Sequence, residues 1–209
     1  MILTGKKGLA AYLAETGGGS LPDIAGCFPG RGLVIVADGA CVWEDLEAFG
    51  CRSDEGRGSV AKDGFDFMAV NHVGALFPGE LKHWFSNSPS HVHRFVAARR
   101  DEYSGEFSPP QHTHACQKGA MWCWPWSGAG TSLLGACLTG VALGYGPIVL
   151  CGAPLDDGPH NGEPPWRRTK FTTEVRGPDK NWQRAIDLVL RGKVTSMSGR
   201  TKDWLGCSI

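Results

Sequence analysis

The sequence predicts an α/β protein with a mostly parallel sheet flanked by helices, and three observations support this prediction. Continuous apolar runs such as Gly32–Ala37 and Ile148–Cys151 are typical of strands that helices cover on both faces. Helical patterns such as Val42–Phe49 separate these runs. The 209 residues, 42% of them hydrophobic, suffice for one large core and are few for two full domains.

The elements are expected in a regular order within a single domain, 1–209. Residues 1–31 form an N-terminal extension, and the irregular segment 99–126 forms a long lid-like insertion, because loops of this length are commonly lids or binding loops. Helices are expected over 4–15, 42–49, from 130 to the Gly144 break, over 179–190 and at 202–205. Strands are expected over 32–37, 65–71, 83–85, 92–98, 148–151 and 193–197.

Charge and hydropathy bear on the class of partner. The chain carries 21 basic and 21 acidic residues, so its net charge does not indicate nucleic acid, although a local basic groove is still compatible with this balance. No segment approaches the apolar length of a membrane span, and the apolar stretch near the N-terminus is too short and interrupted for a signal peptide. We therefore expect no membrane association.

Eight cysteines at first suggest a disulfide framework. However, Cys137 lies in a predicted helix, and Cys41 and Cys151 lie in or beside predicted buried strands, which suits reduced cysteine used as a small hydrophobic residue. A chain of this length also builds a core without covalent cross-links. The expected compartment is the cytoplasm.

The start of the small-residue helix, Gly130-Thr131-Ser132, is a candidate anion site. Backbone N–H groups at a helix N-terminus are unpaired within the helix and lie at the positive end of its dipole. Together with two hydroxyl groups they can bind a phosphate. The alternative is that Thr131 or Ser132 only caps the helix.

Polar residues follow several predicted strands. Asp38-Gly39 comes after the first strand, Asn71 ends the second, and Asp156 follows Ile148–Cys151. Carboxyl ends of parallel strands share one edge of the sheet, where ligands of open α/β sheets bind. These side chains therefore predict a binding cleft, although Asp and Asn also favour such bends by bonding their own backbone.

Two further segments contribute candidates for chemistry at this edge. His160 follows the Asp156 loop and can act as a general acid or base, because histidine titrates near neutral pH. Ser198 and Arg200 lie in a turn after a predicted strand, where the guanidinium group can neutralise a phosphate. A solvated histidine and a solvated arginine are the ordinary alternatives.

The segment 112–126 contains a candidate metal set. His112, His114 and Cys116 share one face of an extended chain, Cys123 follows, and these residue types suit zinc. Their spacing matches none of the common zinc motifs, so an ordinary loop is an alternative. Three alternating tryptophans, at 122, 124 and 126, either face a ligand or anchor this segment to the core.

Three stretches carry a family resemblance: GLVIVADGACVWEDL, FDFMAVNHV and GTSLLGACLTGVALGYGPIVLCGAPLDD. They resemble a Rossmann-like superfamily that includes the single-domain bacterial sialyltransferases and the hydroxymethylpterin-pyrophosphokinase-like proteins. With the C-terminal SMSGRT turn, they also resemble small uncharacterised proteins of tailed phages and prophages. The resemblance covers most of 32–205. It implies one Rossmann-like domain that binds a nucleotide or nucleotide-sugar.

The resemblance also implies roles for individual residues. Asn71 matches the second-strand asparagine and Thr131 and Ser132 the helix-start hydroxyls, whereas Asp38 stands where the sialyltransferases have an asparagine-containing turn. Asp156 is the counterpart of an acidic metal ligand in the pyrophosphokinase-like proteins, which implies a divalent metal cofactor.

The function expected from these residues and this resemblance is a nucleotide- or nucleotide-sugar-dependent, glycosyltransferase-like transferase of phage type. Its acceptor is unknown, and nucleic acid is one candidate. In this function Asp38, Gly39, Asn71, Gly130–Ser132, Ser198 and Arg200 bind the nucleotide, while His160 and Asp156 take part in catalysis. The alternatives are a non-catalytic nucleotide-sequestering protein and a metal-dependent pyrophosphoryl transferase.

Overall fold

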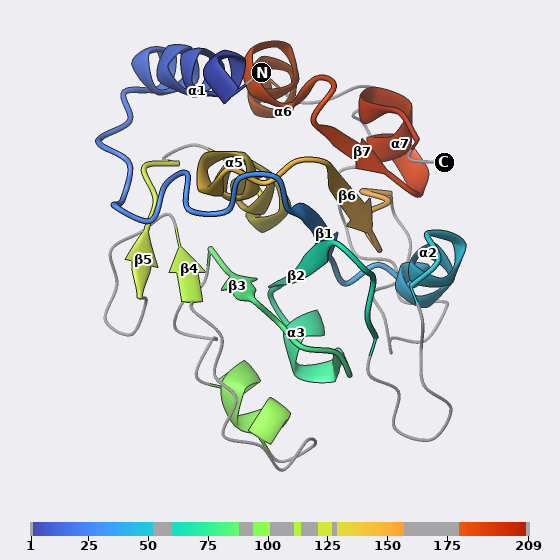
Figure 1. Ribbon diagram of the computed structural model, residues 1–209. Coiled ribbons are helices and arrows are strands. Elements are labelled where there is room, and N and C mark those ends of the chain that lie inside the picture. The colour runs from blue at the N-terminus through green and yellow to red at the C-terminus, as the bar shows by residue number, and fades with distance from the viewer. Residues whose placement is uncertain are drawn as a thin grey trace.

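The computed structural model describes residues 2–51, 60–87, 94–100, 111–113, 121–126, 129–156 and 180–207 (Figure 1). Within these ranges seven strands form one sheet in the order β5-β4-β3-β2-β1-β6-β7, and every neighbouring pair is parallel. The strands are β1 Gly32–Val36, β2 Phe65–Val70, β3 His83–Phe85, β4 Gln111–Thr113, β5 Trp122–Cys123, β6 Ile148–Cys151 and β7 Val194–Ser196. The α/β class with a parallel sheet is thus confirmed.

The strand order reverses between β1 and β6. From β1 the chain adds β2, β3, β4 and β5 on one side, and then it returns to place β6 and β7 on the other side. In open α/β sheets the connections at such a reversal leave in opposite directions and open a crevice at the carboxyl ends of the strands. The topology therefore makes the space beyond the ends of β1 and β6 the candidate position for a ligand site.

Helices cover both faces of the sheet (Figure 1), as the Rossmann-like arrangement requires. Alternate residues of β1 belong to different cores: Leu33 and Ile35 pack on one face, and Val34 and Val36 pack on the other. On the first face lie α1 Ile2–Thr16, α5 Ser132–Leu143, α6 Lys180–Ala185 and the π-helix η1 Ile186–Leu190. On the second lie α2 Val42–Ala48, α3 Val73–Leu76 and a helix over 94–100, while α7 Gly199–Leu205 follows β7.

Helix α5 packs directly on the sheet because glycines let its backbone approach closely. An added Cβ at Gly135 would lie 2.5 Å from the Phe85 ring, and one at Gly140 would lie 2.8 Å from the Leu33 side chain. The helix ends at Gly144, whose φ of 97° is the left-handed conformation common after a helix. None of the helices in the described part of the chain is both long and apolar enough to span a lipid bilayer.

The prediction of a strand over 92–98 is wrong, because residues 94–100 form a helix. The helix forms because the spacing of Phe95, Val96 and Arg99 places their side chains on one face of a helix. Phe95 stacks on the Trp84 ring with the centroids 6.3 Å apart, Val96 is buried, and Arg99 donates to the carbonyl oxygen of Gly74. Two alanines between them add helix propensity.

The expected N-terminal extension and lid-like insertion both contribute to the sheet and its cores. Helix α1, in the expected N-terminal extension, buries Leu9 and Tyr12 in the core on the α5 face. Within the expected lid-like insertion, β4 and β5 extend the sheet, and the stacked rings of Trp124 and Trp126 are fully buried. These two tryptophans therefore anchor the segment to the core.

We predict that Gly135→Ala destabilises the protein by up to about 2 kcal/mol. An alanine gains about 1 kcal/mol of helix propensity over glycine, but overpacking a buried interface costs about 1–3 kcal/mol, and the Phe85 ring is fully buried. Urea unfolding measures the change. Gly19→Ala is the control, because its Cβ would meet nothing closer than 4.0 Å. A more stable Gly135→Ala protein contradicts the close packing of α5.

Candidate functional site

A pocket opens at the carboxyl ends of β1 and β6, at the reversal of strand order. The ends of three strands line it, through residues 37–39, 70–71 and 152–156, together with the start of α5 at 131–133. Six residues predicted from the sequence are among these lining residues: Asp38, Gly39, Asn71, Thr131, Ser132 and Asp156. The structure thus brings together residues that lie up to 118 positions apart in the chain, between Asp38 and Asp156.

The other predicted site residues lie elsewhere. Gly130 directly precedes the lining residues of α5. Ser198 and Arg200 are not among the lining residues, and their contacts place them behind one wall of the pocket. His160 lies outside the described residues.

Backbone strain is concentrated at this pocket. Among the described residues, Asn71 and Leu155 are the non-glycine residues with positive φ, at 56° and 47°, and both line the pocket. Leucine adopts this conformation rarely, whereas asparagine tolerates it. Such strain costs about 1–3 kcal/mol per residue and clusters at ligand sites. It therefore supports this edge as the candidate functional site.

The Asn71 side chain is held in a fixed orientation. Its Oδ1 accepts a hydrogen bond of 2.9 Å from Ser86 Oγ, and its backbone oxygen accepts one of 2.7 Å from Trp84 Nε1. Because Oδ1 faces Ser86, the amide Nδ2 is the part of the side chain left to donate to a ligand. Asn71 therefore offers the pocket a positioned hydrogen-bond donor.

The hydroxyl groups at the start of α5 both have structural roles. Thr131 caps the helix, since its Oγ1 accepts from the Leu134 N–H at 3.2 Å, and Ser132 Oγ accepts from the Asn87 N–H at 3.2 Å. Capping was the alternative to ligand binding for Thr131. The two functions are compatible, because each hydroxyl can still donate and the first N–H groups of the helix lack partners within it.

A buried carboxylate that the sequence did not reveal holds one wall of the pocket. Asp45 Oδ2 accepts hydrogen bonds from the Gly152 N–H at 2.8 Å and from Ser198 Oγ at 2.6 Å. The Cys41 thiol also donates to it at 3.6 Å, and burial raises the pKa of this thiol to about 11. Asp45 thus joins α2, the loop after β6 and the turn before α7.

The Ser198–Thr201 turn supports the same wall from behind. The Arg200 N–H donates to the Pro154 carbonyl at 2.9 Å. Gly199 has a φ of 60°, and an added Cβ would lie 2.4 Å from Pro154 Cα. The turn therefore positions the pocket loop through its backbone.

His72 is a polar residue near the pocket that sequence reasoning missed. Its Nδ1 lies 3.8 Å from Asp38 Oδ2, and its side chain is 48% exposed. Its place directly after Asn71, at the end of β2, was the available signal. Among the described residues, His72 and Asp38 form a histidine–carboxylate pair at this edge of the sheet.

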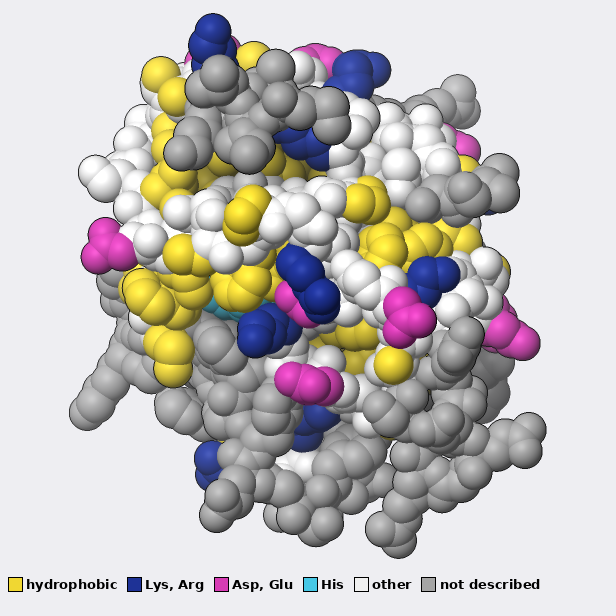
Figure 2. Space-filling view, in the orientation of Figure 1, with side chains coloured by type: hydrophobic (Ala, Val, Ile, Leu, Met, Phe, Trp, Pro, Cys, Tyr) yellow, Lys and Arg dark blue, Asp and Glu magenta, His cyan; other side chains and the backbone are white. Residues whose placement is uncertain are grey.

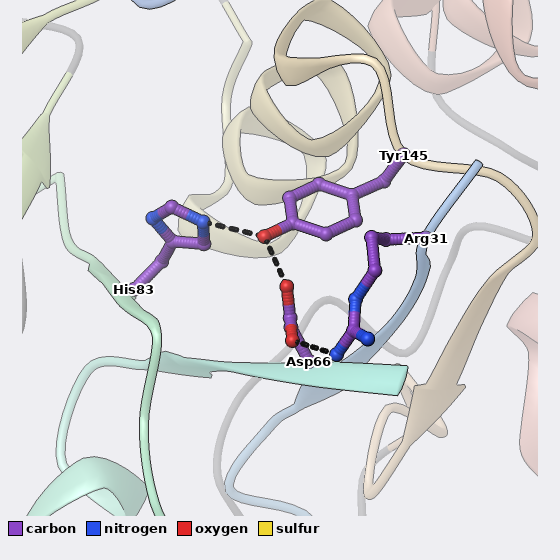
Figure 3. Close-up of polar contacts among 4 residues, drawn as sticks. All are labelled: Arg31, Asp66, His83 and Tyr145. Atoms are coloured by element: carbon purple, nitrogen blue, oxygen red, sulfur yellow. Dashed lines mark hydrogen bonds and ion pairs between the residues drawn. The ribbon is translucent and has the colours of Figure 1, made fainter. Parts of the chain in front are cut away.

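A second polar cluster lies at the opposite, amino end of the strands (Figure 3). Tyr145 Oη donates to Asp66 Oδ2 at 2.8 Å, and His83 Nε2 lies 2.9 Å from Tyr145 Oη. Arg31 forms an ion pair with the same carboxylate. Phe28 stacks on the Tyr145 ring with the centroids 5.0 Å apart, so the cluster is closed by an aromatic side chain.

The hydrogen bonds of this cluster continue inward from His83 to His112 and Trp124, and the donor of each bond can be assigned. Trp124 Nε1, which can only donate, donates to His112 Nδ1 at 3.0 Å. His112 Nε2 then carries the proton and donates to His83 Nδ1 at 2.9 Å, so His83 in turn donates from Nε2 to Tyr145. Burial lowers the pKa of His83 to about 4 and that of His112 to about 3, so both are neutral near pH 7.

His112 belongs both to this cluster and to the predicted zinc set. Both ring nitrogens of His112 are engaged, by Trp124 and by His83. His114 and Cys116 lie outside the described residues. Among the residues that are described, no three His, Cys, Asp or Glu side chains are grouped to hold a metal ion, and the cysteines there form no disulfide.

The comparisons with known proteins give no family for the chain. No family model matches it, and no curated protein and no solved structure is significantly similar to it.

Figure 2 shows that Lys and Arg side chains are interspersed with Asp and Glu on the face drawn.

We predict that acid destabilises the protein through His83 and His112. Their folded-state pKa values, about 4 and 3, lie below the value of about 6.5 for unfolded histidine. The unfolded chain therefore binds protons that the folded one does not, and stability is fully present above pH 6.5 and is lost as the pH falls toward 4. Each histidine adds a slope of up to about 1.4 kcal/mol per pH unit.

Urea unfolding between pH 7.5 and 4.5 measures this slope in the native protein and in His83→Gln. The variant should be less stable at pH 7.5 and less sensitive to acid, because one of the two buried histidines is gone. Equal slopes for the two proteins contradict the assignment.

We also predict that Asp45→Asn destabilises the protein by about 1–3 kcal/mol, because an amide cannot accept all the hydrogen bonds that converge on Oδ2. Glu44→Gln, an exposed neighbour on the same helix, should change stability by less than about 0.5 kcal/mol. Thermal unfolding of both variants gives the comparison. Equal stabilities would show that Asp45 does not hold the pocket wall.

Proposed function

We propose that the protein binds a nucleotide or nucleotide-sugar in the pocket at the carboxyl ends of β1 and β6 and acts as a transferase. The observation that carries this proposal is the pocket at the reversal of strand order, which unites six of the predicted site residues. Nucleotide-binding α/β domains place their ligands at the same point of the sheet.

The chemistry of the pocket supports a ligand with both apolar and polar parts. Val70, Leu133 and Leu155 provide apolar walls. Asn71 Nδ2 and the N–H groups at the start of α5 donate hydrogen bonds, while the Asp38 and Asp156 carboxylates accept them. A few positioned polar groups in an apolar cavity are what small-molecule sites need for orientation and specificity.

The transferase part of the proposal rests on the resemblance to the sialyltransferases and to the phage proteins. Transfer of a sugar from a nucleotide requires a group that removes the proton of the acceptor hydroxyl. Asp156 and His160 are the residues proposed from the sequence, and His72 beside Asp38 is a candidate supported by its position.

We predict that nucleotides stabilise the protein against heat. A ligand at 100 times its Kd adds about 2.7 kcal/mol, so a thermal-shift panel of UMP, CMP, UDP-sugars and CMP-sialic acid should identify the base. Asn71→Asp should lose most of the shift, because the donor is replaced by a negative charge while the positive φ is still tolerated. Asn181→Asp on α6 is the matched control, and equal shifts in both variants contradict the assigned pocket.

Nucleotide release from the stabilising donor then separates the functional classes. Slow release without acceptor and faster release with one support a transferase. Stabilisation without consumption identifies a nucleotide-sequestering protein, and pyrophosphoryl transfer that is abolished by chelation identifies the metal-dependent alternative. A chain that no member of the panel stabilises is not a protein of this class.

A further inference from the structure

The chain of hydrogen bonds through His83 and His112, which we call the histidine pair, has a direction that each of its ends fixes independently. As a carboxylate, Asp66 can only accept, so Tyr145 gives it the single hydroxyl proton and accepts in turn from His83 Nε2 (Figure 3). The Trp124 indole can only donate, so His112 Nδ1 accepts from it. Both ends therefore require each neutral histidine to carry its proton on Nε2.

This chain has no place for an additional proton on the histidine pair. Such a proton can enter only at an Nδ1 atom. Nδ1 of His112 already faces the Trp124 N–H at 3.0 Å, and Nδ1 of His83 faces the Nε2–H of His112 at 2.9 Å. In either position two N–H groups would point at each other, so the proton breaks one hydrogen bond of the chain. Because both nitrogens of His112 are used within the chain, neither is available to a metal ion.

The bond from Trp124 is the one that costs least to break. A proton on His83 lies nearer to the Asp66 carboxylate than one on His112, since only the Tyr145 hydroxyl separates His83 from it. If His112 then moves its own proton to Nδ1, its Nε2 accepts a charge-assisted bond from His83, and such bonds are about twice as strong as neutral ones. The bond that is lost is the neutral one from the indole.

The charged and titratable groups that face the histidine pair from neighbouring elements, among the described residues, are Asp66 of β2, Arg31 before β1, Lys82 before β3 and Tyr145 after α5. Burial lowers the pKa of His83 to about 4, and it outweighs the carboxylate of Asp66, which raises this pKa, while Lys82 lowers it further. The pair is therefore neutral near pH 7 and takes up a proton only in acid.

Trp126 is a natural reference for this event. It is fully buried, and its ring stacks on that of Trp124 with the centroids 5.8 Å apart. Its Nε1 donates to Thr139 Oγ1 of α5 at 2.8 Å, so its hydrogen bond lies outside the chain. A proton on the histidine pair leaves this bond in place.

We propose that the histidine pair is an acid-sensitive switch, in which one added proton breaks the hydrogen bond from Trp124 to His112 and releases the Trp124 indole before the protein unfolds. Trp124 directly follows β5, which ends the sheet on that side, and elements at the edge of a structure open at a lower free energy than its centre. The switch lies apart from the carboxyl-edge pocket and does not rest on the proposed function.

NMR spectra of the native protein between pH 7.5 and 3.5 test the proposal, through the ¹H–¹⁵N signals of the indole N–H groups and the ¹⁵N shifts of the imidazole rings. We expect the Trp124 indole signal to shift or weaken with the same midpoint as protonation of His83, while the Trp126 signal keeps its position. Over the same range, the proton of His112 should move from Nε2 to Nδ1.

Trp124→Phe and Trp126→Phe are matched variants, because each removes one indole N–H from a buried ring of the same stack. Only Trp124→Phe removes the donor that opposes protonation, so its histidine pair should bind the proton about tenfold more tightly than in the native protein. In Trp126→Phe the proton affinity should stay within about twofold of the native value. If a variant does not fold, the spectra of the native protein decide.

Four results overturn the proposal. They are loss of both indole signals in a single unfolding step, protonation of His83 with the Trp124 signal unmoved, no change of either signal down to pH 3.5, and equal proton affinity in the two folded variants.

Discussion

The pocket depends on one buried residue, Asp45. Its carboxylate accepts hydrogen bonds from the Gly152 N–H and from the Ser198 hydroxyl. These residues come from α2, from the loop after β6 and from the turn before α7, so a single carboxylate joins three segments that are distant in sequence. A buried carboxylate costs free energy unless it is well hydrogen-bonded, and here several donors converge on it. Without it, the loop that carries Leu155 and Asp156 would lose one of its supports, and the backbone bond from Arg200 to Pro154 would remain.

The two ends of the sheet are built differently. At the carboxyl end the order of the strands opens a crevice, and the residues around it include the strained Asn71 and Leu155. From the Asp66–Arg31 pair at the amino end, a chain of hydrogen bonds runs inward through Tyr145, His83 and His112 to Trp124, which follows the end of β5. Its members come from β2, β3 and β4 and from residues next to β1, β5 and β6, so it fixes neighbouring strands to one another. One end is thus fixed by polar packing, and the other is open to a ligand.

Much of this architecture was predictable because its signals are local. The strands β1 and β6 are continuous apolar runs, β2 is apolar apart from Asp66, and the polar residues that follow these strands share one edge of a parallel sheet. The order of apolar runs and polar residues along the chain is therefore enough to place Asp38, Asn71 and Asp156 at one edge of the sheet, and the strand order then brings them around one pocket. The helix over 94–100 was missed because its apolar residues also fit a strand, and only contacts with Trp84 and Gly74 select the helix.

Other features depend on contacts that no local pattern contains. Asp45 looks like an ordinary acidic residue near a helix start, and only the return of Gly152 and Ser198 to its side makes it structural. In the same way, His83 and His112 are single histidines in short strands, and their pairing arises from the sheet order. Ser198 and Arg200 were predicted to bind the nucleotide, but their contacts support the pocket wall, and neither residue is among those that line the pocket.

The proposed nucleotide binding at the carboxyl-edge pocket can be tested residue by residue. Amide chemical-shift mapping by NMR does so, during titration with the nucleotide or nucleotide-sugar that stabilises the protein best. We expect the largest saturable shifts at Gly39, Asn71, Leu133 and Leu155, with little change at Arg31 and Tyr145 at the other end of the sheet. Saturable shifts centred on Arg31 and Tyr145, with none at the pocket, would show that the ligand binds at the wrong end of the sheet for the proposed site.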